Sequence, residues 1–443
     1  MSINSLKNSI RQKIHAHKKN KILYFRAIIH IILFFLLSNY RKNRCLIDPP
    51  SDFFYKYKNL ANYFSIPLVI FASYLRRKKI FISINNGYNY SPGHIYTEIL
   101  LVQKIQKLDN KYSGSTIWFT TSRKEILGET NRIFENEKFR VLFGGIKRIF
   151  LTFVALKEPS ISIDGGVSDV NYFLGKSNSA RITYHNLSKR RAKLISKGQD
   201  FFPNIDKLQI YQEHAKQLMQ RLNVTKKYVV IQNKDKSVNG TLKLLAPDLL
   251  LKAIKYFQDK DYQIIFAGRE KFPDVFLNKS IINYANSKYA SSLNDFILIG
   301  NCSLVISSAS GFCTIPESFD KPLLIINSHH IIQHFGRRTI YLPTLLSRNS
   351  KTFNARVQHR YLCTYGADCG YGVFDDFYIL HMPTSEEIFM AAKELEEMLS
   401  STIPPLTPLQ KKTRDSGGCP LLSDGLSRIS NYYLIKHGIF FEK

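Results

Sequence analysis

The hydrophobic and polar positions from residue 79 onward alternate between short apolar runs and longer amphipathic stretches. The apolar runs are rich in Ile, Val, Leu and Phe and end in turn residues, which is typical of buried strands. One amphipathic stretch, 94–108, has its expected buried face at Ile95, Ile99, Val102 and Ile105. Buried strands that alternate with helices predict a parallel sheet with crossover connections, and therefore an α/β fold.

This pattern occurs twice, on either side of an amphipathic helix that ends near Leu222. The first set of predicted strands comprises 79–84, 116–120, 140–143 and 161–164, and the second comprises 228–232, 262–268, 296–300, 303–307 and 322–327. Helices are also predicted at 247–258 and 385–399. The run 296–300 continues almost without a break into the next strand, so a helix or loop is the alternative there. We therefore predict two doubly wound Rossmann-type domains, at 79–222 and 223–400.

The remaining segments flank these domains. Residues 1–44 carry ten Lys or Arg and no Asp or Glu around the eleven-residue run Ala27–Leu37, which is apolar except for one His. Because about 20 apolar residues are required to span a bilayer, we expect 1–78 to contain a helix that lies on an anionic membrane surface. A spanning signal anchor and an ordinary packed helix are the alternatives. Residues 401–443 are predicted to be a surface linker followed by a final helix.

The composition adds charge and compartment to this picture. Lys and Arg outnumber Asp and Glu by 63 to 34, a net charge of +29, which indicates an anionic partner: nucleic acid, lipid or a phosphorylated substrate. Because the cations of residues 1–44 lie beside an apolar run, lipid fits better than nucleic acid. The six cysteines show no zinc-ligand spacing and favour a reduced compartment. We expect a cytoplasmic protein, peripheral or monotopic at the inner face of the cytoplasmic membrane.

The stretch "SLVISSASGFCTIPESFDKPLLIIN", 303–327, places small residues between a strand and a short helix. Small side chains at Ser308, Ser310 and Gly311 would let a phosphate approach free backbone N–H groups at the helix start. Thr314 would add a hydroxyl, and the carboxylate of Glu317 would accept both hydroxyls of a ribose. A tight turn that serves only packing is the alternative. The GxGxxG and GxxxxGK[ST] motifs are both absent from this stretch.

Polar residues also follow two other predicted strands of the second domain. Lys234 and Asp235 follow 228–232, and Gly268 and Arg269 end or follow 262–268. The cations would neutralise a pyrophosphate leaving group, a role that metal ions have in other enzymes. Each cation taken alone is more commonly an ordinary surface charge; their shared position at the carboxyl ends of strands favours a site.

Two candidate bases lie in the first domain. His94 stands at a predicted helix start with Glu98 one turn later, and an imidazole beside a carboxylate is a workable general base. Asp164, at the end of the predicted strand 161–164, is the rival base. Helix capping or packing for His94, and a turn role for Asp164, are the structural alternatives.

Several of these motifs together resemble a known family. "SGFCTIPES", 310–318, resembles the S-G-x-x-T-x-x-E pattern of the membrane-associated N-acetylglucosaminyltransferase of peptidoglycan lipid-precursor synthesis, which also has a Gly-His pair like that of Gly93 and His94. Over about residues 80–440 the chain is more similar to a family of bacterial glycosyltransferases from surface-polysaccharide gene clusters. The shared features are an early G-H-x-x-x-E, a basic-acidic pair like "NKD", the stretch "LIGNCSLVISSASG" and a late "SRIS".

The resemblance implies a GT-B-like fold, in which two Rossmann-type domains face each other across a cleft. It implies transfer of a sugar, without metal or cofactor and with inversion, from a nucleotide-sugar donor held mainly by the second domain. The expected acceptor is a lipid-linked or other glycan of surface-polysaccharide or lipopolysaccharide synthesis. A nucleotide-sugar epimerase of the same fold, a basic nucleic-acid-binding protein and a non-catalytic membrane scaffold are the alternatives.

Overall fold

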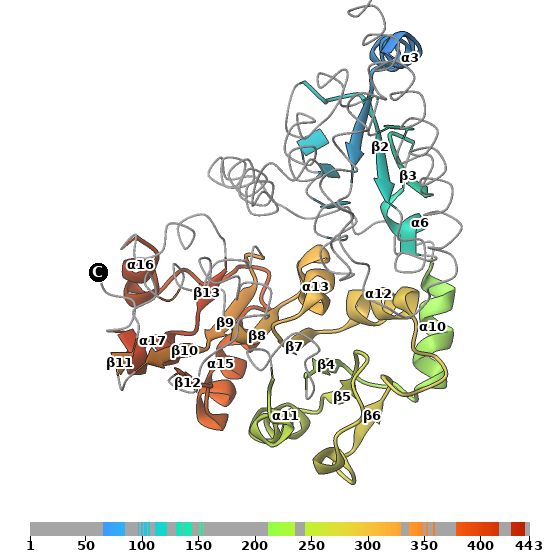
Figure 1. The fold of residues 1–443 in the computed structure, drawn as a ribbon. Helices are drawn as coiled ribbons and strands as arrows, with labels where there is room; N and C mark the ends of the chain where they lie inside the picture. Colours follow the sequence, from blue (N-terminus) through green and yellow to red (C-terminus); the bar gives the residue numbers. More distant parts are fainter. Residues whose placement is uncertain are drawn as a thin grey trace, which may run out of the picture. The chain divides into compact units, whose positions relative to one another are not determined.

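A computed structural model describes much of the second half of this chain and parts of the first. The described residues are 65–84, 96, 99–100, 102–103, 105–106, 111–121, 130–135, 137–143, 150–151, 154, 211–234, 244–328, 336–348, 351–352, 358, 378–415 and 427–438. The chain forms two compact units (Figure 1). Unit 1 comprises Met1–Asn86, Ser115–Arg123 and Arg140–Ser188, and unit 2 comprises Gly87–Gly114, Lys124–Phe139 and Lys189–Lys443.

Helix α3 and a three-stranded sheet account for most of the described residues of the first unit. The sheet has the order β1-β2-β3, with bounds Ile80–Ile84, Thr116–Thr121 and Phe139–Phe143, as predicted. Strands β1 and β2 are parallel. The predicted strand 161–164 lies outside the described residues.

The second unit is built on a seven-stranded sheet of order β13-β9-β8-β7-β4-β5-β6, in which every neighbouring pair is parallel. Its strands, in chain order, are β4 Tyr228–Gln232, β5 Gln263–Phe266, β6 Ile281–Asn283, β7 Leu304–Ser308, β8 Leu323–Ser328, β9 Thr339–Pro343 and β13 Arg428–Ile429. The predicted α/β class is confirmed. A small antiparallel sheet contains β10 Leu345–Arg348, β11 Lys351–Thr352 and β12 Tyr378–His381.

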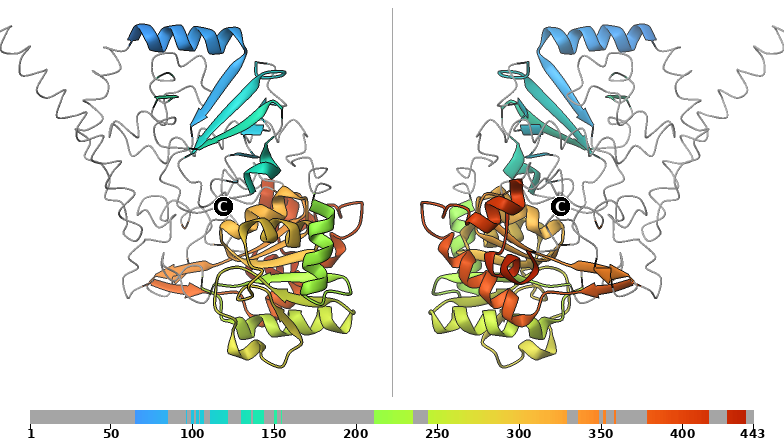
Figure 2. Two further views of the ribbon diagram at one scale, coloured as in Figure 1. Left: turned by 90° about the vertical axis from the view of Figure 1, so that its right-hand side faces the viewer. Right: turned by 90° about the vertical axis from the view of Figure 1, so that its left-hand side faces the viewer.

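Helices cover both faces of the seven-stranded sheet (Figures 1 and 2). On one face lie α10 Gln212–Arg221, α12 Ser292–Asn301 and α13 Thr314–Ser318; on the other lie α11 Leu251–Asp259 and α15 Ser385–Glu397. Because neither face meets solvent, all residues of β4, β7, β8 and β9 are buried. This explains why these strands are almost continuous apolar runs.

Most predicted helices are confirmed. The prediction 247–258 corresponds to the 3-10 helix η5 Pro247–Leu250 followed by α11, and 385–399 corresponds to α15, which begins with a capping box between Thr384 and Glu387. The described residues of the predicted helix 94–108 are helical, and Ile99, Val102 and Ile105 are buried. Ile95 lies outside the described residues.

The predicted strand 296–300 is wrong, and the helical alternative is correct: these residues belong to α12. The hydroxyl of Ser291 caps this helix by accepting a hydrogen bond from the backbone N–H of Asn294 at 3.1 Å. Residues 296–299 are all buried because the helix is enclosed on nearly every side, and so its sequence lacks the polar face that would distinguish it from a strand.

The C-terminal segment differs from the prediction: the expected linker 401–423 includes a helix, and the start of the predicted final helix is a strand. Helix α16 spans Pro408–Asp415, and β13 then joins the edge of the sheet beside β9 before the last helix, α17 Asn431–His437. The side chain of Gln410 donates to the carboxylate of Glu394 at 2.7 Å and to the carbonyl of Ile429 at 2.9 Å. These contacts tie the segment to α15 and β13.

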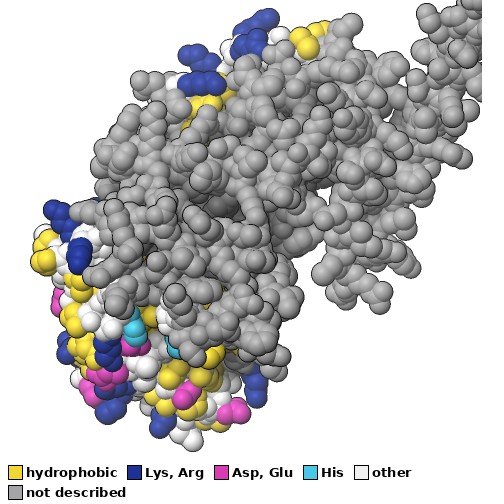
Figure 3. Space-filling model, turned by 60° about the vertical axis from the view of Figure 1, so that its left-hand side comes forward, with side chains coloured by type: hydrophobic (Ala, Val, Ile, Leu, Met, Phe, Trp, Pro, Cys, Tyr) yellow, Lys and Arg dark blue, Asp and Glu magenta, His cyan; other side chains and the backbone are white. Residues whose placement is uncertain are grey.

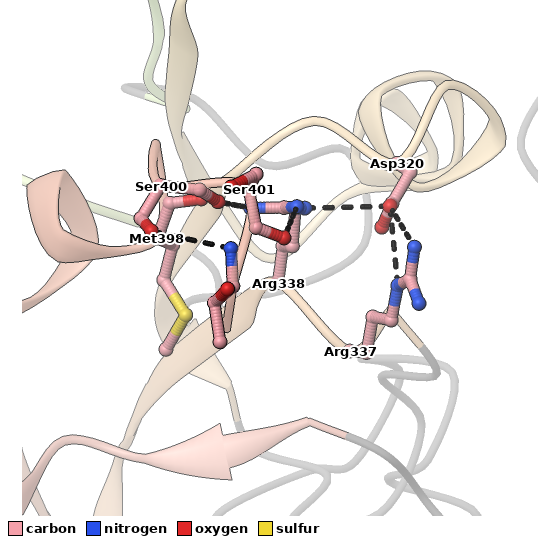
Figure 4. Close-up of polar contacts among 7 residues, drawn as sticks. Asp320, Arg337, Arg338, Met398, Ser400 and Ser401 are labelled. Atoms are coloured by element: carbon pink, nitrogen blue, oxygen red, sulfur yellow. Dashed lines mark hydrogen bonds and ion pairs between the residues drawn. The ribbon is translucent and has the colours of Figure 1, made fainter. Parts of the chain in front are cut away.

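Arg338, which precedes β9, holds the C-terminal end of α15 (Figure 4). Its guanidinium donates to the carbonyls of Met398, Ser400 and Ser401, and also to the carboxylate of Asp320. A cation suits the carbonyl of Met398, which caps the helix, because the last carbonyls of a helix carry partial negative charge. The bonds to Ser400 and Ser401 fix the turn that follows.

Among the helices that the structure describes, none combines the length and the apolar character needed to cross a membrane.

Candidate functional site

The strand order of the second unit reverses between β4 and β7. From β4 the chain proceeds outward through β5 to β6, and from β7 it proceeds in the opposite direction through β8 to β9. In open α/β sheets, ligands bind beyond the carboxyl ends of the strands at such a reversal. Here β4 ends at Gln232 and β7 ends at Ser308. The structure therefore brings the stretches after β4, β5 and β7 to one edge of one sheet.

The side chain of Gln232 connects the ends of β4 and β7. Its Oε1 accepts hydrogen bonds from the hydroxyls of Ser307, at 2.7 Å, and Ser310, at 3.3 Å. The backbone N–H of Lys234 donates to the hydroxyl of Ser308 at 2.8 Å. Gln232, Ser307 and Ser308 are buried, so these bonds form in a dry environment where they are strong and directional.

Gly268 brings the end of β5 to the same side chain. Its φ of +106° is in the region that favours glycine. A Cβ at this position would lie 2.8 Å from Cγ of Gln232, closer than side-chain carbons approach one another. Glycine is thus required at residue 268 both for its backbone conformation and for its contact with Gln232.

The turn after β7 is partly open to solvent. Ser308 and Ala309 are buried, whereas Ser310, Gly311, Phe312 and Thr314 are half-buried. Gly311–Cys313 form the 3-10 helix η7, and the hydroxyl of Ser310 accepts from the backbone N–H of Phe312 at 3.2 Å. Ser308 therefore belongs to the framework of the turn, and residues 310–312 and Thr314 form its surface.

Glu317, at the far end of this segment, has contacts at the opposite edge of the sheet. Its Oε1 accepts from the backbone N–H of Gly336 at 3.1 Å and from the hydroxyl of Thr339 at 3.5 Å. Thr339 is the first residue of β9 and thus lies at the amino edge. To hold a ribose near the turn after β7, the carboxylate would have to exchange these partners.

The cations at the carboxyl edge have different surroundings. Lys234 is half-buried, and Arg269 is exposed. The charge of Arg269 acts on Asp295, in the first turn of α12, whose carboxylate accepts from the hydroxyl of Tyr284 at 2.9 Å. Burial raises the pKa of Asp295 to about 7, although the Tyr284 hydrogen bond and Arg269 both act to lower it.

Tyr96 and α12 are in contact within the second unit. The rings of Tyr96 and Phe296 meet edge to face with centroids 4.9 Å apart. Burial raises the pKa of Tyr96, and hydrogen bonds with Thr130 and Ser292 partly counter that effect. Tyr96 and Thr130 thus lie near the first turn of α12, which contains Asp295.

Four of the predicted site residues, His94, Glu98, Asp164 and Asp235, lie outside the described residues, and their roles stay predictions. Two groups of this edge were not among the predicted site residues. Gln232 had a signal, because it is a polar residue that ends a fully apolar run. The Tyr284–Asp295 pair had none, because 296–300 was predicted as a strand and the first turn of a helix was not expected there.

No protein-family model matches this chain, and no curated protein matches it. Solved structures with a similar arrangement include a glycosyl transferase family 9 protein from Veillonella parvula DSM 2008, with a TM-score of 0.40 and 12% identity, covering 72% of this chain and 96% of that one. The E. coli heptosyltransferase WaaC with ADP-2-deoxy-2-fluoro heptose has a TM-score of 0.34 and 10% identity, covering 59% and 92%.

The UDP-GlcNAc 2-epimerase from Methanocaldococcus jannaschii has a TM-score of 0.33 and 13% identity, covering 60% of this chain and 88% of that one. Glycosyltransferases and an epimerase are thus both among the structural neighbours. Since these TM-scores are below 0.5, the similarities carry no argument about the activity of this chain.

Proposed function

We propose that this protein is a glycosyltransferase that moves a sugar from a nucleotide-sugar donor to a lipid-linked or other glycan acceptor. The proposal is supported mainly by one observation. Gln232, Gly268 and the serines of the turn after β7 join the carboxyl ends of β4, β5 and β7 at the reversal of the strand order. This is where α/β sheets hold phosphorylated ligands.

In the proposed reaction, the donor pyrophosphate lies against the surface of the turn at residues 310–312. The side chains of Lys234 and Arg269 balance the negative charge that grows on the leaving nucleoside diphosphate, which is the part of the transition state that most needs stabilisation. The reaction would need no metal for this purpose. Ser308 keeps the turn in place through Lys234.

The acceptor hydroxyl oxygen attacks the anomeric carbon as the bond from that carbon to the diphosphate oxygen breaks. The proton of the hydroxyl passes to a general base, for which His94, assisted by Glu98, and Asp164 are the candidates. Attack on the face opposite the leaving group would invert the anomeric configuration.

The proposed setting is the inner face of the cytoplasmic membrane, where a lipid-linked acceptor of surface-polysaccharide or lipopolysaccharide synthesis is available. The support is the basic segment 1–44 with its apolar run, since cations beside an apolar helix favour an anionic leaflet. The proposed architecture has the donor at the carboxyl edge of the seven-stranded sheet and the acceptor in the predicted domain 79–222, as in GT-B enzymes.

A thermal-shift screen of the full chain against UDP, GDP, CDP, dTDP and ADP sugars tests the proposal. One nucleotide class is expected to stabilise the protein, by about 2.7 kcal/mol at a concentration one hundred times its Kd. No stabilisation by any donor would contradict the proposal. If a stabilising donor is then supplied without acceptor, epimerised free nucleotide sugar would identify an epimerase instead.

Matched variants in the same screen locate the site. Lys234→Ala is expected to weaken donor binding about tenfold or more, because a cation beside the diphosphate is lost. Lys255→Ala removes an exposed cation of α11 that pairs with Asp259, and donor binding should be unchanged. Glu317→Ala measures the predicted ribose contact: an unchanged donor affinity would remove that assignment.

A further inference from the structure

Helix α3, Ser65–Arg77, has apolar residues on two faces. One face buries Leu68, Ala72 and Leu75 in a cluster with residues of β1 and of 151–154. The other face leaves apolar side chains in solvent: Val69 is 39% exposed, Ile70 is 65% exposed and Tyr74 is 49% exposed. A helix that only packed on its own unit would carry polar residues on this outer face.

Cations border the exposed apolar residues. The helix ends with Arg76 and Arg77, and Lys78 and Lys79 follow directly; all four are exposed. No Asp or Glu lies between Ser65 and Lys79. Figure 3 shows hydrophobic and basic side chains next to one another on the surface where α3 lies.

We propose that the outer face of α3 docks on an anionic lipid bilayer. Ile70 and Tyr74 would enter the boundary between headgroups and acyl chains, and Arg77 and Lys78 would contact anionic headgroups. Tyrosine suits this depth because its ring is apolar and its hydroxyl is polar.

Length and charge favour a membrane surface over other occupants. Thirteen helical residues extend about 20 Å, less than the roughly 30 Å hydrocarbon core, so α3 lies on the bilayer and does not span it. Nucleic acid would match the cations and leave Val69 and Ile70 in water. An anionic lipid surface can contact both the apolar residues and the cations of this face.

This surface extends the membrane setting of the proposed function, on which it does not depend, because it lies in the first unit and needs no donor chemistry. It adds a contact distinct from the segment 1–44. Two points of attachment would hold the first unit with α3 parallel to the membrane.

A site-specific fluorescence measurement tests the proposal in the full chain. Trp118 is the sole tryptophan, so Tyr74→Trp in a Trp118→Phe background reports on α3 alone. Vesicles of phosphatidylglycerol and phosphatidylethanolamine should shift its emission to the blue, and brominated acyl chains should quench it. Phosphatidylcholine vesicles, or 0.5 M salt, should weaken both effects. Ile435→Trp in the same background, at a 67% exposed position of α17 in the second unit, should show neither effect.

Emission from Tyr74→Trp that vesicles leave unchanged would overturn the proposal, even if the segment 1–44 holds the protein on them. Emission already blue-shifted without vesicles and unchanged by them would show that the chain itself or a second copy covers the face, and would overturn it equally.

A second variant avoids the substitution of Trp118. Ile70→Glu, in the otherwise native chain, is expected to lower vesicle affinity at least tenfold while donor stabilisation in the thermal-shift screen stays unchanged. Ile435→Glu is its matched control and should keep both properties. Vesicle affinity unaffected by Ile70→Glu would contradict the docking surface and leave the proposed function intact. Absence of donor binding in the unaltered chain would contradict the proposed function and leave the docking surface intact.

Discussion

Gln232 shows how one side chain can organise several strand ends. It accepts from Ser307 and Ser310 and fills the space that a side chain at residue 268 would need. The proposed donor site therefore depends on a residue that is itself buried. Such a residue acts by positioning others, so its substitution should weaken donor binding although Gln232 itself is not exposed.

Gln232→Met is expected to lower donor affinity about tenfold. The variant keeps the volume beside Gly268 but removes the oxygen that accepts from Ser307 and Ser310, and each such hydrogen bond contributes about 0.5–1.5 kcal/mol. Ser307 keeps the carbonyl of Ser308 as an acceptor, at 2.9 Å. Calorimetric titration with the donor identified in the screen measures the change.

Gln263→Met is the matched control for this prediction. Gln263 begins β5 at the opposite, amino edge, where its side chain accepts from the backbone N–H groups of Thr225 at 2.7 Å and Lys226 at 2.9 Å. This variant should lose stability and keep donor affinity. Equal donor affinities for Gln232→Met and Gln263→Met would show that Gln232 has no special part in the site.

Asp295 gives a pH-dependent prediction. Its pKa in the fold is about 7, above its ordinary value of 3.8, so the fold favours the neutral carboxyl. The wild type should thus lose stability relative to Asp295→Asn as the pH rises from about 4 to about 7, where the carboxylate becomes charged in a half-buried position. Urea unfolding at pH 4, 6 and 8 measures the difference: the variant should be the more stable protein at pH 8, and its advantage should disappear by pH 4. A difference that is the same at every pH would refute this account.

Among the elements, α12 and α15 show two ways in which a helix depends on its surroundings. The apolar part of α12 matches a buried strand as well as a buried helix, and the cap at Ser291 lies outside that run. Periodicity therefore could not separate the two. The capping box of α15 is local, so both its start and its type were predictable.

The C-terminal end of α15 depends on a distant residue, which gives a stability prediction. Arg338→Ala should lower the free energy of unfolding by about 2–4 kcal/mol, because it removes the partner of the carbonyls of Met398, Ser400 and Ser401, which follow α15. It also leaves the carboxylate of Asp320 with less compensation. Arg337→Ala is the control. Arg337 binds the same carboxylate but is more exposed, with 38% of its side chain in solvent against 14% for Arg338, and its loss should cost about 1 kcal/mol or less. Equal losses in urea unfolding would contradict the role of Arg338 at α15.

For the molecule as a whole, the net charge indicates membrane attachment, and the seven-stranded sheet indicates donor binding. The excess of cations indicates an anionic environment, and two of its concentrations, segment 1–44 and the end of α3, belong to the first unit. The reversal of the strand order belongs to the second unit. Membrane attachment and donor binding can therefore be tested separately.

The amino-acid pattern was sufficient to predict the α/β class, most strands of the large sheet and the shared edge of Lys234, Arg269 and the turn after β7. Strands covered on both faces must be apolar throughout, and the loops that follow parallel strands lie at one edge of the sheet. Both properties can therefore be recognised from short stretches of the sequence. The pattern could not predict that β7 would pair with β4, or that β13 would be added at the edge from residues expected to form the start of the final helix.

Contacts between distant segments set the details of the candidate site. Ser307 and Gln232 are 75 residues apart in sequence, and Glu317 meets Gly336 and Thr339 only because β9 lies beside β8. Such contacts depend on how the entire sheet packs, and a local pattern reflects only near neighbours along the chain. The three-dimensional structure was therefore needed to show which strand ends Gln232 joins, and that the carboxylate of Glu317 has its contacts at the opposite edge.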